Sequence, residues 1–339
     1  MRAVYGMKAR LALPPIALLI AVVVAFGSGQ FAVSLPELWG YVMSLVVSGP
    51  SSEASATVET IIVQIRLPRI LAAVSVGAAL AVAGTAYQGM FRNPLVSPDI
   101  LGVSAGAGLG AVVGIFLGLS MLWVQLLAFV GGLVAVALVY AVARFARHHG
   151  STLAMALSGI AIGSLLGAGI SLLKILADPY TELPSITFWL LGGLNAVTLA
   201  DVATTVPIML LGLVPLILLR WRMNVLSLSD EEATALGVNV VQTRLWFILS
   251  ATLMTAAAVS ITGIIGWIGL VIPHIARLWV GPNFTRLLPT ALFMGAAFLV
   301  LTDTLARTLA SIELPLGILT SFLGAPFFLS LLMKGGRHG

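Results

Sequence analysis

Apolar runs of about 20 residues recur from one end of this chain to the other, and each is long enough to cross a hydrocarbon core of roughly 30 Å as a helix. Because lipid offers no hydrogen-bond partners, each run must satisfy its own backbone, which a helix does and an open strand does not. A soluble domain needs more polar surface than a composition of 60% hydrophobic and 9% charged residues supplies. The sequence therefore predicts an all-α polytopic integral membrane protein.

We expect about ten transmembrane helices in a single domain that covers residues 1–339. The eighth is too short to cross alone and needs enclosure by its neighbours. A short amphipathic segment, Ser185–Leu191, is expected between the fifth and the sixth. The first, Leu11–Phe26, has the alternative interpretation of a secretory signal peptide, which the length of its apolar run disfavours. In chain order the predicted spans are 11–28, 63–88, 99–118, 122–145, 152–175, 201–220, 243–263, 268–279, 285–306 and 315–334.

The basic residues are distributed unevenly between the two sides of this topology. With the N-terminus in the cytoplasm, the outer side carries only Arg66, Arg69, Lys174 and Arg307 of the 17 Lys and Arg residues. This positive-inside bias supports ten spans with both termini in the cytoplasm. Because the charges are scattered singly between apolar runs, the net charge of +5 does not indicate nucleic-acid binding. The cytoplasmic set is Arg2, Lys8, Arg10, Arg92, Arg144, Arg147, Arg220, Arg222, Arg244, Arg277, Arg286, Lys334 and Arg337.

Two of the spans carry a stripe of glycine at every fourth residue. Small residues at this spacing let helix backbones approach closely in lipid, where packing drives association. We expect tight packing inside one subunit, and the lining of a transport pathway is the alternative. The glycines are Gly102, Gly106, Gly110, Gly114 and Gly118 in the third span, and Gly159, Gly163 and Gly167 in the fifth.

Motifs for catalysis and for nucleotide binding do not occur in the sequence. It contains no cysteine and no G-x-x-x-x-G-K-[ST] phosphate loop. The histidines at 148, 149, 274 and 338 do not form a metal-binding pattern. Ionisable residues deep inside the spans are nearly absent, whereas coupled transporters usually keep some there as relays. An enzyme and a secondary transporter are therefore disfavoured, no cofactor is expected in this chain, and the energy for any transport must come from a partner.

The longest polar stretch on the cytoplasmic side is Leu226–Arg244. Ser229 and Glu232 have the spacing of a capping box, and Asp230 and Glu231 fall in the first turn, where the helix dipole favours negative charge. A short helix is therefore predicted to begin at Asp230.

The same stretch continues through a glycine into the seventh span. Gly237 supplies a left-handed C-terminal cap, and Asn239 can cap the next helix. Residues 226–240 are thus predicted to form two short cytoplasmic helices joined at a glycine. A docking module for a partner protein is favoured over an ordinary solvated loop.

Four ordered motifs resemble those of the FecCD-type permease subunits of type II ABC importers, which take up iron–siderophore complexes, haem and vitamin B12. The motifs extend from residue 66 to residue 328 and so cover nearly the whole chain. Trp267 stands where the family usually has phenylalanine. The matching residues are Arg66-Leu67-Pro68-Arg69 with Leu71; Gln88, Arg92-Asn93-Pro94-Leu95, Pro98 and Leu101-Gly102; Gly263, Gly266-Trp267-Ile268-Gly269-Leu270, Pro273-His274 and Arg277; and Asp303, Arg307, Glu313-Leu314-Pro315, Gly317, Gly324, Pro326 and Phe328.

The resemblance implies a set of partners. A second permease copy, expected to form a homodimer although a heterodimer stays open, would enclose the pathway. Two ATPase subunits would bind ATP and Mg, and a periplasmic or lipid-anchored substrate-binding protein would deliver the cargo. The chain would then lie in the inner membrane of a prokaryotic cell, in contact with lipid.

The resemblance also assigns functional residues. Arg66, Arg69 and Arg307 would dock the binding protein, because guanidinium groups stay charged and can bind carboxylates bidentately; helix-end anchoring is the alternative. The ATPase would dock on Asp230, Glu231, Glu232, Ala233, Leu236 and Gly237. A structural or gating motif would consist of Arg92, Asn93, Pro94, Gly269, Pro273, His274 and Arg277.

Two members of the gating motif have individual expectations. Asn93 before Pro94 favours a tight cytoplasmic turn. His274, which follows Pro273, is expected to be a buried and hydrogen-bonded histidine and not a metal ligand.

The cargo is the least constrained part of the interpretation. An iron–siderophore complex, the commonest cargo of the family, is expected. Cobalamin, haem and an oxyanion such as molybdate stay open, although Asp178–Pro184 lacks the arginine expected in haem permeases. A secondary transporter is the alternative class.

Overall fold

The computed structural model describes residues 2–29, 36, 37, 39, 40, 43, 58–145 and 151–335. The predictions for Arg147, His148, His149, Arg337 and His338, and for the side chains of Arg2 and Lys334, lie outside the described residues. Regular structure in the described part is entirely helical. The elements are α1 (Arg2–Gly27), η1 (Thr60–Arg66), α4 (Leu67–Met90), η2 (Pro98–Leu101), α5 (Val103–Phe116), α6 (Met121–Phe145), α7 (Ser151–Leu176), α8 (Glu182–Leu191), α9 (Leu199–Leu218), α10 (Arg220–Leu226), α11 (Asp230–Ala235), α12 (Val240–Thr262), α13 (Ile268–Val280), α14 (Phe284–Thr308) and α15 (Leu316–Gly335).

The ten predicted spans correspond to ten apolar helices among these elements. Seven are long and apolar enough to cross a membrane, namely α1, η1 with α4, α6, α7, α9, α12 and α14. The shorter apolar helices α5, α13 and α15 complete the set. The predicted all-α polytopic fold is therefore confirmed. The short eighth span is α13, which packs against α4, α14 and α15 as its length requires.

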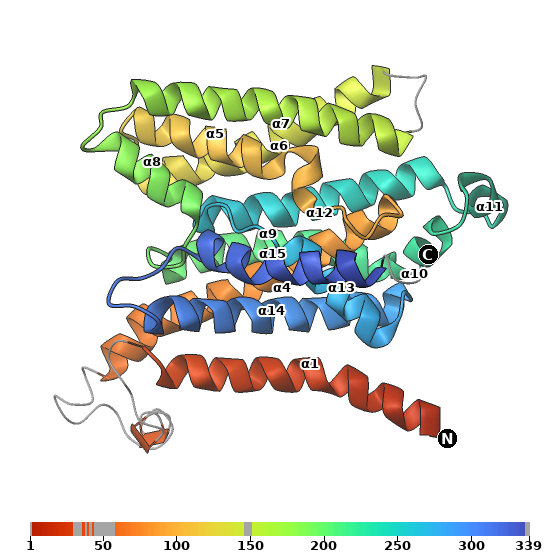
Figure 1. Cartoon of the computed structure of the whole chain (residues 1–339), viewed down its shortest axis with the longest axis horizontal. Coiled ribbons are helices and arrows are strands. Elements are labelled where there is room, and N and C mark those ends of the chain that lie inside the picture. Colours follow the sequence, from red (N-terminus) through yellow and green to blue (C-terminus); the bar gives the residue numbers. More distant parts are fainter. Residues whose placement is uncertain are drawn as a thin grey trace.

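The helices lie side by side with their axes roughly parallel (Figure 1). Both termini lie at the same end of the bundle as α10 and α11. We call this the α11 end, and the opposite end, where α4 begins and α14 finishes, the Arg69 end. The amphipathic segment predicted before the sixth span is α8, which starts beside the end of α7 and leads back into the bundle.

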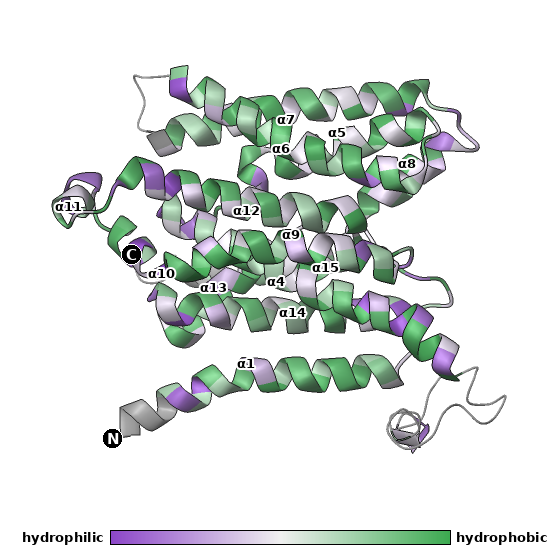
Figure 2. Cartoon of the chain, turned by 180° about the vertical axis from the view of Figure 1, so that it is seen from behind, coloured by the Kyte–Doolittle hydropathy of each residue, from purple (hydrophilic) through white to green (hydrophobic). Residues whose placement is uncertain are grey.

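Figure 2 shows that hydrophobic residues dominate the lengths of the helices and that hydrophilic residues gather at the two ends. Around the α11 end these include exposed Arg10, Arg144 and Arg286. This separation is what a bilayer demands, since charged groups near helix ends reach water while the helix centres face lipid.

The core of the bundle is built around α4 and α12, the two most enclosed spans. Glycines bring their neighbours close: a Cβ added at Gly84 would overlap the carbonyl oxygen of Gly269 on α13, and one at Gly77 would overlap that of Gly295 on α14. Across the pair, the Tyr87 hydroxyl of α4 lies 3.1 Å from the Thr252 hydroxyl of α12. Helix association in lipid depends on such close packing and on interhelical hydrogen bonds.

The two glycine stripes behave differently. On α5, a Cβ at Gly106 or Gly110 would overlap backbone carbonyls of α6, so the prediction of tight internal packing is confirmed there. On α7, Gly159 packs against η2, but nothing lies within 4 Å of a Cβ at Gly163 or Gly167 among the described residues. The side-chain direction at these two positions is open, although the backbone of Gly163 lies 3.8 Å from a Cβ added at Gly102, so the tight packing predicted for this stripe is confirmed only at Gly159.

Candidate functional site

The short helix α11 begins and ends as predicted. The Ser229 hydroxyl accepts from the Glu232 N–H at 3.2 Å, and the Glu232 carboxylate accepts from the Ser229 N–H at 2.9 Å, which completes a capping box. Gly237 has a φ of +79°, and its N–H and that of Val238 donate to carbonyls of the last turn in a Schellman arrangement. The helix is therefore specified locally by its own sequence.

The flanks of α11 differ from the prediction. The helix α10 precedes it and was not predicted. Asn239 accepts from the Gln242 N–H at 3.0 Å and begins α12, which continues without a break to Thr262. Residues 226–240 therefore contain the last residue of α10, the short helix α11 and the first residue of α12. The helix that Asn239 caps does run into the seventh span as predicted, but it is the span itself and not a separate short helix.

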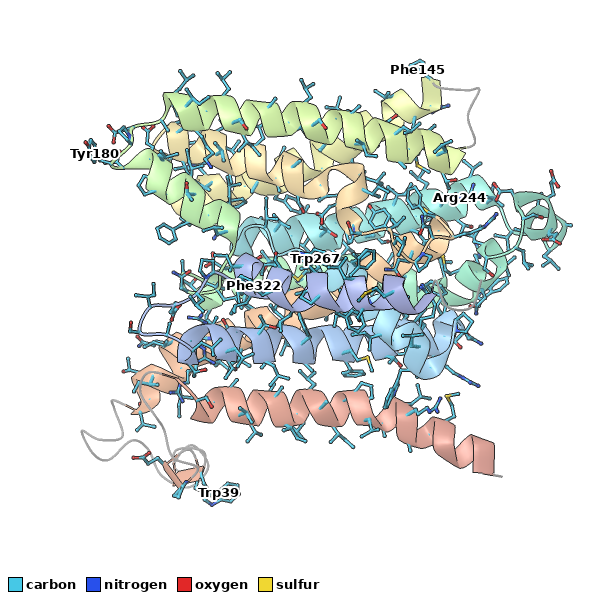
Figure 3. The ribbon with its side chains drawn as sticks, viewed as in Figure 1. Trp39, Phe145, Tyr180, Arg244, Trp267 and Phe322 are labelled. Carbon is cyan, nitrogen blue, oxygen red and sulfur yellow. The ribbon has the colours of Figure 1, made fainter. Side chains whose placement is uncertain are left out.

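Asp230, the first residue of α11, joins two other helices. Arg92, just after α4, donates to its carboxylate at 2.6 Å, and Arg244 of α12 donates to both of its oxygens at 2.7 and 2.8 Å. Arg244 lies beside the segment that leads to α11 (Figure 3). The hydrogen bonds and charge of Arg244, and then those of Arg92, lower the pKa of Asp230 against the opposing effect of burial. The short helix is thus tied by charge to the ends of the two central spans.

The turn after α4 has the tight form predicted for Asn93 and Pro94. The N–H of Arg92 donates to the Gly89 carbonyl and that of Asn93 to the Gln88 carbonyl, which is a Schellman motif. Arg92 occupies the left-handed position with a φ of +51°, where glycine is usual. Its guanidinium is held by the Leu226 carbonyl at 2.8 Å and by Asp230, and these bonds offset the backbone strain.

All but one of the residues predicted to dock an ATPase are exposed. Glu231, Leu236 and Gly237 are exposed, and the Leu236 side chain is 61% exposed although it is apolar. Ala233 is fully buried against the core, so its assignment as a contact residue is corrected. The exposed side of α11 is therefore an acidic turn followed by an apolar tip.

At the Arg69 end, a second network links four parts of the chain. Arg69 of α4 donates to both oxygens of Asp303 of α14 at 2.8 and 3.0 Å, and to both oxygens of Glu313 at 2.9 Å. Arg307 lies 3.2 Å from Asp303 and donates to the Ser28 carbonyl at 3.1 Å. Arg66 donates to a carbonyl near the end of α1. Each cation is thus paired within the chain.

This pairing bears on the predicted docking of a binding protein. Arg66, Arg69 and Arg307 do lie at the end opposite α11, but they are only 3%, 7% and 7% exposed. In this conformation their guanidinium groups bind carbonyl groups at the end of α1 and the carboxylates of Asp303 and Glu313. Their role in docking stays a prediction.

The remaining gating residues surround the end of α4. Gly269 and Pro273 are buried in α13. Arg277 donates to the Gln88 side chain at 3.1 Å. His274 is half-buried, and no hydrogen bond to its ring occurs among the described residues, so the expected hydrogen-bonded histidine is wrong. The described part of the chain also holds no group of side chains suited to a metal ion.

Between α12 and α13 the chain is not helical, and Trp267 takes a φ of +70°. Such a value is an outlier for a bulky residue. The ring packs against Gly324 and meets the Phe328 ring edge-on at 6.3 Å. It lines an apolar cavity of about 660 Å³ together with Phe322, and the two lie near mid-bundle (Figure 3).

Arg244, Asp303 and Glu313 belong to these networks although the sequence motifs assign them no role. Asp303 and Arg307 are four residues apart, the spacing of a helical ion pair, so this signal was present in the sequence. Arg244 and Glu313 meet their partners only through tertiary structure, and no local pattern could have found them.

The fold and the site together define a class of protein. A bundle of ten apolar helices that exposes a capped helix at one end, in a sequence without a phosphate loop, has the architecture of an ABC transporter permease. The chain matches the FecCD transport family over residues 17–334, and it belongs to that family. Such permease subunits are transport components and not enzymes.

Relatives match over nearly the whole chain. The "Probable iron chelatin transport system permease protein" of Helicobacter pylori (strain ATCC 700392 / 26695) is 41% identical over 316 residues, covering 93% of this chain and 95% of its own. The molybdate import system permease protein of Haemophilus influenzae (strain ATCC 51907 / DSM 11121 / KW20 / Rd) is 38% identical over 327 residues, covering 95% and 94%. Other relatives are named for cobalamin and hemin transport.

A solved structure assigned to a metal-chelate type ABC transporter, in an inward-facing conformation, has a TM-score of 0.86 and 37% identity. The match covers 96% of this chain and 98% of that one. The similarity therefore extends to the full arrangement of the helices.

Proposed function

We propose that this chain is the permease of an ATP-driven importer of a metal chelate in a prokaryotic inner membrane, with α11 and both termini in the cytoplasm. The observation that carries the proposal is α11 itself. It exposes Glu231 and Leu236, while Asp230 on its other side is held by Arg92 and Arg244. A partner bound to the exposed side would therefore act on the ends of α4 and α12.

Two ATPase subunits that bind ATP and Mg are the proposed partners at α11. The apolar Leu236 tip suits insertion into a groove, and the acidic first turn suits a basic rim. When the ATPases close, α11 moves with them. Because α4 and α12 are the most enclosed spans, their displacement changes the packing of the whole bundle.

A second copy of the chain is the proposed partner along α7. Gly163 and Gly167 leave this helix open to close approach by another helix. Leu165 is 72% exposed on the same helix. Gly163→Leu is expected to leave the subunit folded but to reduce dimers, measured by size-exclusion chromatography with light scattering. Gly110→Leu, which would overlap α6, should instead prevent folding.

The binding protein is proposed to dock at the Arg69 end. Glu313 is the most exposed member of the network there, with its side chain 36% exposed. A carboxylate of the binding protein could displace Glu313 from Arg69, because the two would compete for the same bidentate geometry. Glu313 lies in the segment between α14 and α15, so docking would release this segment from Arg69. The helix α15 that follows lines the cavity beside Trp267.

An iron chelate is the proposed cargo, with cobalamin, haem and molybdate as alternatives, since relatives of similar identity are named for each. The cognate binding protein, purified with its natural ligand and analysed by mass spectrometry, would identify the cargo.

Co-purification tests the proposed docking site. The tagged chain should retain its ATPase, and Leu236→Asp should lose it without a change in Tm. Leu119→Asp is the matched control, because Leu119 is an exposed leucine between α5 and α6 at the opposite end. Retention of the ATPase by Leu236→Asp would remove α11 as the docking element.

A further inference from the structure

A cavity of about 550 Å³ lies at the α11 end, and several of the residues that line it belong to the predicted gating motif. It is enclosed by the turn after α4, by α10, by the second half of α13 and by the start of α14. Polar side chains on its lining include those of Gln88, Arg92, Asn224, His274 and Arg277. The cavity is thus a meeting point of four elements and not a groove on one helix.

The lining is cationic. Its charged side chains are two arginines, and neither Asp nor Glu is among the described residues that line it. Arg92 is partly neutralised by Asp230 from outside the cavity. Arg277 has no carboxylate partner in the described part of the chain, because its side chain donates only to the neutral amide of Gln88. A positive field therefore remains in the cavity.

The hydrogen-bonding groups also suit an anion. Guanidinium groups present donors in a planar fork that matches phosphate oxygens. The His274 ring lines the same space without a partner among the described residues, so its N–H is available to a ligand. Half-buried cations gain more from an anion than fully solvated ones do, because water screens them less.

The position of the cavity fits the membrane boundary. Trp221 of α10 and Trp279 of α13 are 52% and 38% exposed, and tryptophan gathers where lipid meets water. The Trp279 indole donates to the Arg10 carbonyl of α1 at 2.9 Å, which fixes this ring at the same end. Basic pockets between helices at such a boundary can receive lipid head groups.

We propose that this cavity binds a phosphate-type oxyanion, supplied either by the head group of an anionic phospholipid or by free phosphate. Arg277 is its principal ligand, with His274 and Arg92 as further donors. Because Arg92 also donates to Asp230, an anion bound in the cavity would interact with the same guanidinium that anchors α11. The site thereby connects an anion at the membrane boundary to the placement of α11.

Two probes test the site on the full chain purified in a neutral detergent. The first is inorganic phosphate, read as the increase of Tm with phosphate at constant ionic strength. The second is phosphatidylglycerol mixed with phosphatidylcholine, read by native mass spectrometry as the anionic lipids retained. Arg277→Gln should lower the affinity for whichever of the two probes binds by at least tenfold, roughly the loss of one charge-assisted hydrogen bond. Arg277→Lys should recover part of the affinity, because it keeps the charge.

Arg286→Gln is the matched control, since Arg286 is exposed near the start of α14 and does not line the cavity. A purely structural role of Arg277 would lower the basal Tm of Arg277→Gln but leave its response to the probes unchanged, and this result would overturn the proposal. An equal loss of probe affinity in Arg286→Gln would also overturn the proposed anion site. A response to phosphatidylglycerol alone assigns the site to lipid, a response to phosphate assigns it to the free ion, and a chain that binds neither contradicts it. His274→Phe gives a second, smaller test through loss of one donor.

Discussion

The two ends of the bundle both hold arginine–carboxylate networks, but the networks differ in burial and in what they connect. At the Arg69 end, Asp303 is 1% exposed and lies between two arginines. At the α11 end, the side chain of Asp230 is 50% exposed. The first network fastens long helices to one another, whereas the second fastens a short helix to the ends of two spans.

The difference concerns which part of the molecule is built to move. A buried and fully paired charge cluster resists separation, since an isolated buried charge is costly. A short exposed helix held by half-solvated pairs opens more easily, and mobile elements are drawn from such low-stability regions. We therefore expect the Arg69 end to be the fixed end of the subunit and the α11 end to be the one at which work is delivered.

The largest expected effect is at the fixed end. Asp303→Asn leaves Arg307 without its carboxylate and Arg69 with Glu313 alone, so we expect a loss of roughly 3–5 kcal/mol of stability. Thermal unfolding in detergent would measure it. Glu313→Gln is the matched control, and because Glu313 is partly solvated its loss should stay near 1 kcal/mol or below. Equal losses in the two variants would contradict the contrast in burial between these two acids.

At the α11 end the corresponding change should be smaller and local. Asp230→Asn removes both ion pairs of a half-exposed carboxylate, for which we expect roughly 1 kcal/mol. Hydrogen exchange should accelerate in α11 and not in α4 or α14. Exchange that rises throughout the bundle would show that α11 is as integral to the fold as the spans are.

Replacement of Arg92 by glycine should hardly change stability. Arg92→Gly relieves a left-handed backbone strain of roughly 1–2 kcal/mol. It loses a solvated ion pair worth up to about 1 kcal/mol and the hydrogen bond to the Leu226 carbonyl, so gain and loss nearly cancel. Transport should nevertheless fall, since α11 is released from α4. Arg92→Ala, which keeps the strain and loses the pair, is the control and should have the lower Tm.

The smallest effect concerns pH. The pKa of Asp230 in the folded chain is lowered. The stabilisation of α11 by its carboxylate is therefore complete above the unfolded pKa of about 3.9, and it is lost only as the pH falls through the lower folded pKa. Protection of α11 against hydrogen exchange, corrected for intrinsic rates, should thus be constant from neutral pH down to about 4. Asp230→Asn should keep only the acid step of Glu232, whose pKa is lowered by its hydrogen bonds to Ser229 in the capping box. A step in the wild type near pH 6 would point to another group.

The sequence was sufficient for much of this architecture. Run length predicted the ten spans, because a bilayer imposes one length on every crossing. The ends of α11 followed from Ser229, Glu232 and Gly237, because caps are local features. The burial of Ala233 and the pairing of Arg244 with Asp230 depend on how α11 sits on the bundle, which no local pattern records.

The glycine stripes show the same limit. Gly110 and Gly163 have identical local spacing, yet one is packed against α6 and the other is open. Periodicity identified a face suited to close approach but not the helix that would occupy it. The arginines at the Arg69 end were similarly placed on the correct side by charge bias, while their burial came from partners distant in sequence.

ATP-dependent uptake in proteoliposomes tests the account most directly. The chain would be reconstituted with its ATPase and with the cognate binding protein carrying its natural ligand, and uptake would be followed with and without ATP. We expect uptake only when ATP, ATPase and binding protein are all present, and we expect uptake to be lost in Leu236→Asp but not in Leu119→Asp. Uptake by the chain alone, or undiminished uptake by Leu236→Asp, would contradict it.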